Sequence, residues 1–529
     1  MNGNRLSRTQ NSLINLLTGT AGSVLVTVLK FVTRTVFIAT LGREYLGING
    51  LFADIMSMLS LTDLGLGLAM NFKLYKPLAE RDEHRVRLLM KLYRDAYRIV
   101  GLAIGVLGLC LIPFLPLLIS DIDSLYPLGV NPVLIFVIYL MQSVSSYLFW
   151  ASCSAVVRAD QRSYLLNIAG YVITLATNVV QILILIFWRD FIAYTVTVIV
   201  FNLIQNGVNA VIAKRLYPYA FEKTKERLDR REIRDIFKDL GALFIYQANG
   251  VAVRATGNIV LSAFIGLGIV GLYSNYMMFY TAVNTILMQV YNAIKASAGN
   301  LFAVSDEDKK YRFFRTMNFA TIMLYGTACV GVAVVADEAI SCWLGADFVI
   351  AQPFALLLGV EILFAGLKAN LGQIRNVSGL FRQMWYRPLL GIVINLAVSI
   401  VTVQFLGING VLLGVIMSAV CANFLIDPGV IYKHAFGSCR PVREYYLSNF
   451  GYMLVLVLTG LADSWICRNV FVGHGWFSLI FHVIVCGLSV PGALMLVYGT
   501  SPECRHIMAT AKSLLRRGGR KRKGSARHG

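Results

Sequence analysis

The chain has 529 residues, of which 57% are hydrophobic and only 14% are charged, and its formal net charge is +20. Soluble proteins have about 25% charged residues, so this composition excludes an ordinary soluble enzyme or binding domain. Apolar runs of roughly 18 residues or more recur from end to end, which indicates membrane-spanning helices. The runs are too continuous for the alternating strands of a β-barrel. We therefore expect an all-α polytopic membrane protein.

About fourteen transmembrane helices are predicted in chain order. The first is too long, and holds too many cations, for a cleaved signal peptide. The predicted spans lie near residues 13–41, 46–70, 96–120, 131–157, 165–187, 191–213, 240–266, 268–300, 314–336, 352–374, 388–405, 409–430, 449–467 and 475–499.

The cations between the spans predict the orientation. With the N-terminus inside, the inside segments hold 40 of the 48 Lys and Arg residues, and the outside segments hold three. Such asymmetry predicts a cytoplasmic location for both termini. It also accounts for the net charge without nucleic acid, and the basic C-terminal tail is expected to lie against anionic headgroups.

Cysteine and histidine give no metal or disulfide signal. The nine cysteines are scattered without a CxxC pair, and no His/Cys cluster has metal-ligand spacing. We expect no metal and no cofactor, and we interpret His482, alone in an apolar helix, as structural. There is no Walker lysine loop, GxSxG or HExxH motif, and no outside loop is long enough for a catalytic domain, so we expect a protein that is not an enzyme.

Two parts of the chain resemble each other at an offset of about 221–224 residues. LGREYLGINGLF at 41–52 is similar to IGLGIVGLYSNY at 265–276, and AGYVITLATNVV at 169–180 is similar to LGIVINLAVSIV at 390–401. Six spans separate the matched segments, so the repeats are predicted to be related by an axis along the membrane normal. The predicted domains are a six-helix bundle (1–213), a linker loop (214–239), a second six-helix bundle (240–430), two additional helices (431–499) and a basic tail (500–529).

Five cations lie inside the predicted spans: Lys30, Arg34, Arg254, Lys295 and Lys368. Charged side chains at the bilayer centre cost about 2.5–3.5 kcal/mol on insertion scales, so they should face protein or water. Polar residues of the first span recur every three or four positions, on one helix face that includes Lys30 and Arg34. At the repeat offset of 224, Lys30 corresponds to Arg254 and Arg34 to Asn258. We predict a basic cavity that selects an anion; structural ion pairs with Asp54 and Glu361 are the alternative.

The intramembrane acids are candidates for ion coupling or charge pairing. Asp54 has the predicted depth of Arg34, and Asp63 is nearer the inside, on the opposite face of the same span. Glu361 has a depth similar to that of the deep cations. The acids considered for this role are therefore Asp54, Asp63 and Glu361.

Several segments together resemble a known family. They are the Asn-rich start with its basic first span, LGREYLGINGLF, the LTDLGLGLAM end of the second span, the RADQRSYLLN loop and the internal repeat. The chain is similar over its whole length to bacterial polysaccharide biosynthesis flippases of the multidrug/oligosaccharidyl-lipid/polysaccharide exporter superfamily. The resemblance implies two six-helix bundles plus two helices, in the bacterial cytoplasmic membrane. It implies alternating access, driven by an ion gradient, that moves undecaprenyl-diphosphate-linked oligosaccharides outward for O-antigen, capsule or exopolysaccharide synthesis.

On this resemblance, the deep cations hold the diphosphate and the sugar fills the lumen. The expected partners are the lipid-linked oligosaccharide, membrane lipids and polysaccharide polymerases or export proteins, and the protein is expected to be a monomer. A multidrug or small-solute exporter, a peptidoglycan-precursor flippase, a polymerase or ligase and an inactive scaffold remain alternatives. The predicted substrate-binding residues are Lys30, Arg34, Arg254, Gln247, Asn258, Asn284, Tyr291 and Lys295.

Overall fold

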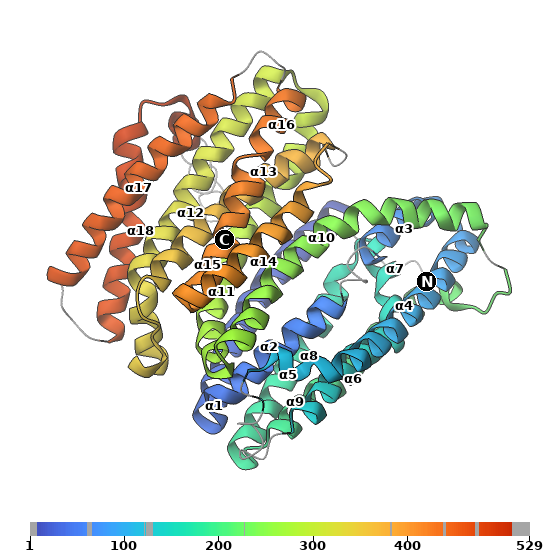
Figure 1. The fold of residues 1–529 in the computed structure, drawn as a ribbon. Helices are drawn as coiled ribbons and strands as arrows, with labels where there is room; N and C mark the ends of the chain where they lie inside the picture. The colour runs from blue at the N-terminus through green and yellow to red at the C-terminus, as the bar shows by residue number, and fades with distance from the viewer. Residues whose placement is uncertain are drawn as a thin grey trace, which may run out of the picture. The chain divides into compact units, whose positions relative to one another are not determined.

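The computed structural model describes residues 8–60, 66–120, 122, 131–226, 228–380, 383–436, 441–470 and 475–509. The chain divides into two compact units, unit 1 (Met1–Ser274) and unit 2 (Asn275–Gly529). The described residues form helices and no strand, which confirms the predicted all-α class of a polytopic membrane protein. In Figure 1 unit 1 runs from blue to green and unit 2 from green through yellow to red.

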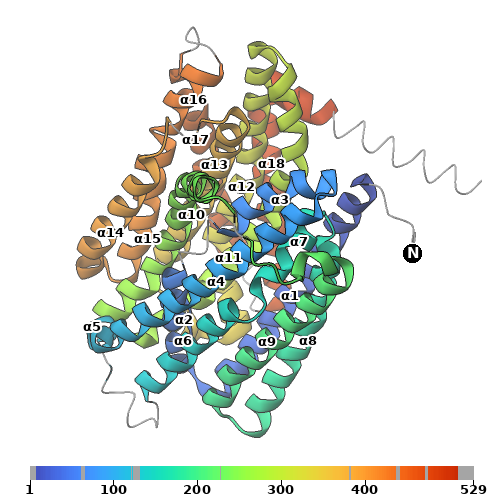
Figure 2. The ribbon, with the colours of Figure 1, turned by 90° about the vertical axis from the view of Figure 1, so that its right-hand side faces the viewer.

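The main helices of unit 1 pack in pairs, some of which are distant in the chain. Helix α8 packs along α1 and α9, and α4 packs along α6; the α8–α9 pair lies side by side in Figure 2. Short caps set the starts of several helices, because a side-chain oxygen accepts the otherwise unpaired N–H groups of the first turn. Asn131 before α6 and Asp190 before α9 are such caps. The helices are α1 (Arg8–Leu41), α2 (Arg43–Leu59), α3 (Leu66–Glu80), α4 (Glu83–Leu111), α5 (Leu115–Leu118), α6 (Pro132–Leu148), α7 (Ser154–Ala159), α8 (Ser163–Phe187), α9 (Phe191–Leu216) and α10 (Arg230–Phe264).

The two copies of the first repeated segment, 41–52 and 265–276, contact each other within unit 1. Gly42, before α2, and Gly266, before α11 (Leu267–Val304), both have a positive φ, of 94° and 123°, which a residue with a side chain rarely adopts. Beyond these turns a Cβ on Gly47 would lie 2.1 Å from the carbonyl oxygen of Leu267, and one on Gly271 would lie 2.4 Å from that of Arg43. Gly47 and Gly271 are 224 positions apart, as are Arg43 and Leu267. The two contacts are therefore copies of each other.

A second pair of contacts has the same relation. Arg34 Nη1 donates to Ser274 Oγ at 3.2 Å, and Asn258 Nδ2 lies 3.3 Å from the position of a Cβ on Gly50. The offset is again 224 for Arg34 with Asn258 and for Gly50 with Ser274. The sequence repeat therefore corresponds to a local two-fold arrangement of these segments.

Adding a methyl group at either glycine of this crossing should be destabilising. Gly47→Ala and Gly271→Ala each place a Cβ against backbone, which cannot rotate away, so the free energy of unfolding should fall by about 1–3 kcal/mol. Gly268→Ala is the matched control, since its Cβ would lie no closer than 4.0 Å to its neighbour, Arg43. Thermal unfolding of the detergent-purified variants measures the difference. Equal stability of all three variants would contradict the close approach.

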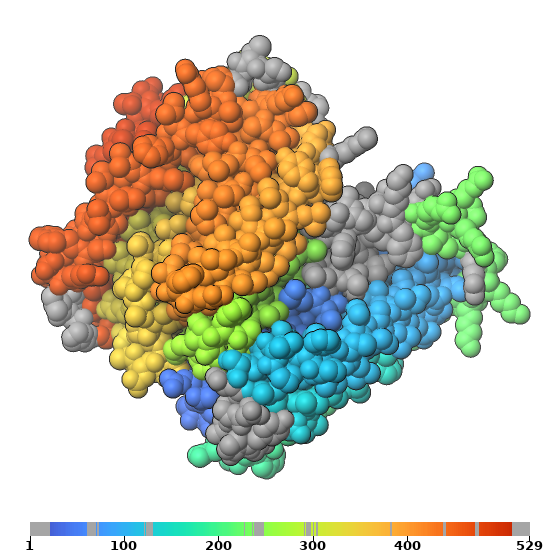
Figure 3. All heavy atoms as spheres, viewed as in Figure 1, coloured from blue at the N-terminus to red at the C-terminus, as the bar shows by residue number. Residues whose placement is uncertain are grey.

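Unit 2 is a second set of long helices. Helix α12 packs along α13, and α14 along α15; the residues of α14 and α15 are orange in Figure 3. One bundle of aromatic rings, from Tyr311, Phe314, Tyr432, Phe436 and Tyr445, ties α12 to α16 and α17. The helices of unit 2 after α11 are α12 (Glu307–Leu344), α13 (Phe354–Ser378), α14 (Arg387–Leu406), α15 (Ile408–Ser418), α16 (Asp427–Ala435), α17 (Arg443–Asn469) and α18 (Trp476–Tyr498).

The two C-terminal helices are attached to α12 by polar contacts as well as by packing. Asn318 Nδ2 donates to Asn449 Oδ1 at 3.2 Å, and both side chains are buried. His482 Nδ1 lies 2.6 Å from Glu338 Oε2. His482 therefore has a structural partner, and α17 and α18 pack as a pair next to α12 (Figure 1).

Eleven of the fourteen predicted spans match a helix, or a bent helix pair, that is long and apolar enough to cross a membrane. The bent pair is Pro132–Leu148 with Ala151–Ala159, which meet at 45°. The other three predicted spans fall on α2 with α3, on α10 and on α11, which are helical but do not meet the same criterion within the described residues. The division at Ser274 follows packing, so the predicted bundle boundaries stay a prediction.

Candidate functional site

A polar hollow of about 500 Å³ lies inside unit 1, and we call it the amide chamber. Six helices (α1, α4, α6, α7, α8 and α9) and the turn before α7 contribute to it. Its lining consists of Val26, Tyr97, Ser146, Tyr147, Ala151, Ser154, Arg158, Leu166, Asn167, Gly170, Tyr171, Thr174, Gln205, Asn206 and Asn209.

Helical spacing brings the polar groups of the chamber together. On α9, Gln205, Asn206 and Asn209 lie within four residues of one another, so they share one face. On α8, Gly170 and Thr174 repeat this spacing. At 1.5 Å per residue Gln205 is about 16 Å from the end of α9, so the chamber reaches well into the predicted membrane region.

The amide groups are only partly used by the protein. Asn206 Nδ2 donates to Ser146 O at 3.3 Å, and Gln205 Nε2 approaches Asn209 Oδ1 at 3.5 Å. Each of these side chains retains donors or acceptors for a ligand. Tyr97 and Tyr147 stack at 6.1 Å on one wall and offer a flat face. Amides, hydroxyls and aromatic rings are groups that suit a sugar.

The chamber has a positive charge and no negative one among its lining residues. Arg158 is exposed, and its side chain makes no hydrogen bond or ion pair within the described part of the chain. The next cation of the same loop is different, since Arg162 Nε lies 3.1 Å from Asp160 Oδ2. Tyr217 donates to the same carboxylate. Burial, and then this hydrogen bond, raise the pKa of Tyr217, so the hydroxyl keeps its proton.

The predicted deep polar residues of unit 1 form two neighbouring contacts. Arg34 is half-buried and donates to Ser274, whereas Asp54 Oδ2 accepts from Asn258 Nδ2 at 2.6 Å. The predicted depth of Asp54 had suggested a pair with Arg34. In the structure Asp54 instead accepts a hydrogen bond from the amide of Asn258 on α10. Asn258 is buried, and its Oδ1 has no hydrogen-bond partner among the described residues. Gly50 lies next to both contacts.

The remaining predicted cations of unit 1 are accessible. Lys30 lies one turn before Arg34 on α1, and Arg254 lies one turn before Asn258 on α10. Both are exposed and make no hydrogen bond or ion pair with the described residues. Asp63 and the side chains of Gln247 and Lys295 lie outside the described residues.

The predicted residues of unit 2 take part in helix packing. Tyr291 is buried and bonds to Thr321 and to the carbonyl of Gly366. Asn284 Oδ1 accepts from Tyr325 at 3.3 Å, and Glu361 Oε1 accepts from Tyr280 at 2.8 Å. These contacts link α11 to α12 and α13. The assignment of these residues to a diphosphate cavity stays a prediction.

The sequence interpretation missed the chamber because it started from the charged residues of the predicted spans, and α8 and α9 carry none within theirs. None of the predicted site residues lines it. The run FNLIQNGVNA at 201–210 places four amide side chains in a predicted span, which is a signal that could have identified α9. Within the described residues no group of three or more His, Cys, Asp or Glu side chains could hold a metal ion.

This chain is similar to known proteins in its structure and not detectably in its sequence. No family model matches the sequence, and no curated protein matches it. The lipid II flippase MurJ, in an inward closed conformation, superposes with a TM-score of 0.60 over 91% of this chain and 98% of its own, at 12% identity. A multidrug resistance MATE family transporter of the MOP superfamily, in an inward-facing conformation, has a TM-score of 0.52 over 75% of this chain and 92% of its own, at 15% identity. A mutant of the Vibrio cholerae MATE transporter VcmN has a TM-score of 0.50 over 81% and 96%, at 14% identity.

The chain has the fold of these transporters. The superposition on MurJ covers 91% of this chain, so the fold assignment includes both units. The identities are too low to carry a substrate from one protein to the other. The predicted all-α polytopic fold is confirmed, whereas the superfamily, the polysaccharide flippase family and the substrate stay predictions.

Proposed function

We propose that this multi-pass membrane protein is a flippase that moves an undecaprenyl-diphosphate-linked oligosaccharide from the inner to the outer leaflet of the bacterial cytoplasmic membrane. Both termini would be cytoplasmic, and the protein would act as a monomer that delivers substrate to polysaccharide polymerases or export proteins. The transport step changes no covalent bond, so the protein would not be an enzyme.

The observation that carries this proposal is the chemistry of the amide chamber. A site for an anionic sugar lipid needs groups that bind hydroxyls, a surface for sugar rings and a cation that is not already paired. The chamber has amides on α8 and α9, stacked Tyr97 and Tyr147, and Arg158. A cation exporter would need negative charge, and the chamber lining contains no acidic residue.

The deep cations support the same class of substrate. Lys30 and Arg254 remain available, and Arg34 is held in position by Ser274. A fixed guanidinium in a low-dielectric site binds phosphate strongly. The two sites together match the two parts of a lipid-linked sugar, with its diphosphate and its saccharide.

Asp54 is the candidate for ion coupling within unit 1, because it is a half-buried carboxylate whose only described hydrogen bond comes from Asn258. Asp54→Asn should abolish the dependence of transport on pH or on sodium, since an amide cannot take up a proton or hold a cation. The measurement is lipid translocation in proteoliposomes with an imposed ion gradient. A pH and sodium dependence identical to that of the native protein would remove Asp54 from the coupling role.

The test of the function is depletion in the host, followed by extraction and mass spectrometry of lipid-linked glycans. We expect one polyprenyl-diphosphate oligosaccharide to accumulate on the cytoplasmic side and surface polysaccharide to fall. The accumulated species would identify the cargo. Unchanged surface polysaccharide without accumulation would refute the proposal and favour a drug or small-solute exporter.

A further inference from the structure

A second hollow of unit 1, of about 330 Å³, is lined by several cations, whereas the amide chamber has one. We call this second hollow the basic cavity. It adjoins the chamber, with which it shares Tyr97, Tyr147 and Ala151. Its lining includes five cations and one carboxylate: Arg87, Lys91, Arg94, Arg98 and Lys214, with Glu222. We propose that the basic cavity binds the phosphate of an anionic lipid headgroup at the predicted cytoplasmic surface.

Two of the five cations build the wall of the cavity. Arg87 Nη2 lies 2.6 Å from Glu222 Oε2, and Arg87 Nε donates to Tyr219 O at 3.1 Å. Lys91 Nζ donates to the carbonyls of Thr224 and Glu226 at 2.8 and 2.9 Å. These contacts hold the segment after α9 against α4, and they use the only acidic side chain of the lining.

The other three cations remain available for a ligand. Arg98 and Lys214 are exposed and make no hydrogen bond or ion pair with described residues. Arg94 meets only its neighbour Asp95, at 3.6 Å. Three cations around one hollow repel each other, so an anion between them is favoured. Phosphate accepts charge-assisted hydrogen bonds from guanidinium and ammonium groups together.

The available cations lie at the boundary between charged and apolar helix segments. On α4 the exposed Ile99 and Leu102 follow Arg98 directly, and on α9 the exposed Val211 precedes Lys214. Apolar residues that face outward on a membrane protein contact lipid, and long cationic side chains beside them extend to the headgroups. Arg98 lies near the middle of α4, where its charged first half meets its apolar second half, and Lys214 lies in the last turn of α9, so we expect both at the depth of lipid phosphates.

The break between α6 and α7 supplies the apolar side of the site. Phe149 and Trp150 line the cavity, and each is 47% exposed. Trp150 has a φ of 58°, a left-handed conformation that costs energy for a bulky residue and often marks a functional position. Aromatic residues of this kind are favoured where headgroups meet acyl chains. The break thus presents rings beside the cations, as a lipid with a charged head and an apolar body requires.

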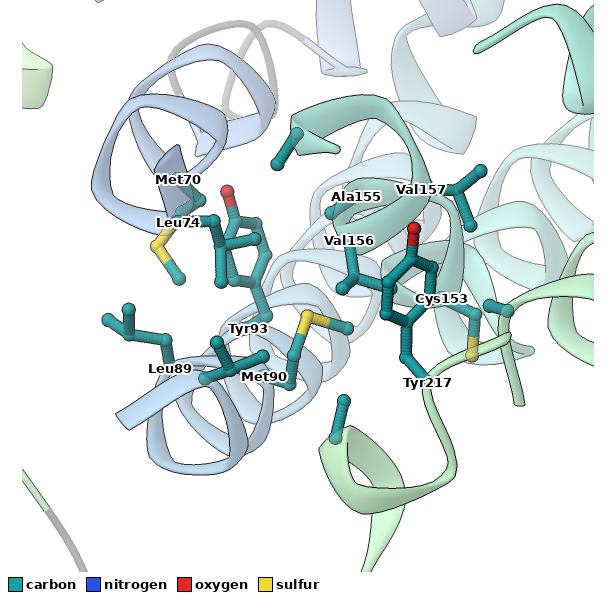
Figure 4. Packing of buried hydrophobic residues seen from close by; sticks show 14 of the residues in the cluster. Met70, Leu74, Leu89, Met90, Tyr93, Cys153, Ala155, Val156, Val157 and Tyr217 are labelled. Atoms are coloured by element: carbon teal, nitrogen blue, oxygen red, sulfur yellow. The ribbon is translucent and has the colours of Figure 1, made fainter. Parts of the chain in front are cut away.

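A cluster of buried hydrophobic residues adjoins the basic cavity and supports its wall. Met90 and Cys153 line the cavity, and both also belong to the buried cluster around Tyr93 and Val156 in Figure 4. The cluster joins α3, α4, α7 and Tyr217, after α9. Because this support is rigid, the cations that extend from it are held near one another before a ligand arrives, which lowers the entropy cost of binding.

The test compares two double variants of the full-length protein. Arg98→Gln with Lys214→Gln removes two available cations of the cavity. Lys76→Gln with Arg215→Gln is the matched control, because it removes two exposed cations of the same predicted inside segments that do not line the cavity. Native mass spectrometry and quenching of tryptophan fluorescence by brominated phosphatidylglycerol measure binding. The Trp150→Phe variant isolates the signal of the cavity.

We expect phosphatidylglycerol affinity to fall about 30-fold in the cavity variant and to stay unchanged in the control, as two headgroup contacts imply. Preferential retention of undecaprenyl diphosphate would place the substrate's own phosphate there, which also supports the proposal. Binding of inorganic phosphate alone, or equal losses in both double variants, would overturn it. The proposal does not depend on transport, so failure of the depletion experiment leaves it intact. Size-exclusion profiles confirm that both double variants fold.

Discussion

Replacing Arg387 with Gln should lower the free energy of unfolding by about 3–5 kcal/mol. Arg387 Nη1 lies 3.1 Å from Asp427 Oδ2, between α14 and α16, and the same guanidinium bonds Asn423. The side chains of Arg387 and Asp427 are 5% and 0% exposed, so loss of the guanidinium leaves a buried carboxylate without its counter-ion. SDS-induced unfolding of the purified protein measures the change.

The double variant Arg387→Met with Asp427→Leu is the control for this pair. It removes both charges and keeps similar side-chain volumes, so most of the lost stability should return. The reason is that the attraction within a buried ion pair is little larger than the free energy needed to desolvate its two charges. A single variant as stable as the native protein would show that the pair is not buried in the membrane-embedded protein. The sequence did not predict this pair, because Arg387 was assigned to a loop and Asp427 to an apolar span.

Replacing Arg158 with Gln should reduce transport of the lipid-linked oligosaccharide about 10- to 150-fold. The reason is the loss of one charge-assisted hydrogen bond in the amide chamber, about 1.5–3 kcal/mol. The measurement is flipping of the labelled lipid-linked glycan in proteoliposomes, with substrate identified by the depletion experiment. Stability should be unaffected, since Arg158 has no described partner to lose.

Arg162→Gln is the matched control for Arg158. It removes a cation from the same loop and has the same effect on the positive-inside balance, but its partner is Asp160 outside the chamber. Arg158→Lys should restore part of the rate, because the charge remains and only the bidentate geometry is lost. Equal rates for the Gln variants of Arg158 and Arg162 would exclude Arg158 from substrate binding.

The sequence predicted the helices well, because the hydrophobic run is a strong and local signal. It also located the repeat, whose glycines make the same backbone contact twice in the structure. The break at Trp150 was not predicted, because 131–157 contains no charged residue and no glycine or proline marks the bend.

The site was predicted less completely than the fold. Arg34 and Asp54 were selected as charges inside predicted spans, and Asn258 was selected as the counterpart of Arg34 in the repeat. The structure shows each with a specific neighbour within unit 1. Tyr291 was selected for its spacing; in the structure it is buried and bonds to Thr321, and its assignment to a substrate cavity stays a prediction. The sequence did not predict the basic cavity, because its cations come from α4 and from the last turn of α9, which are far apart in the chain and are brought together by packing.

The local two-fold arrangement at Gly47 and Gly271 means that the chain contains, in effect, a homodimer contact within one polypeptide. In an isologous dimer each contact occurs twice, once on each side of the two-fold axis, so one mutation changes both copies of the contact. Once the two copies are joined in one chain, each side can change alone. The positions of Arg34 and Asn258, and of Gly50 and Ser274, show the result. In one copy the guanidinium of Arg34 lies beside the hydroxyl of Ser274, and in the other the amide of Asn258 lies beside Gly50, which has no side chain. The two copies of the contact therefore have the same geometry and different charge.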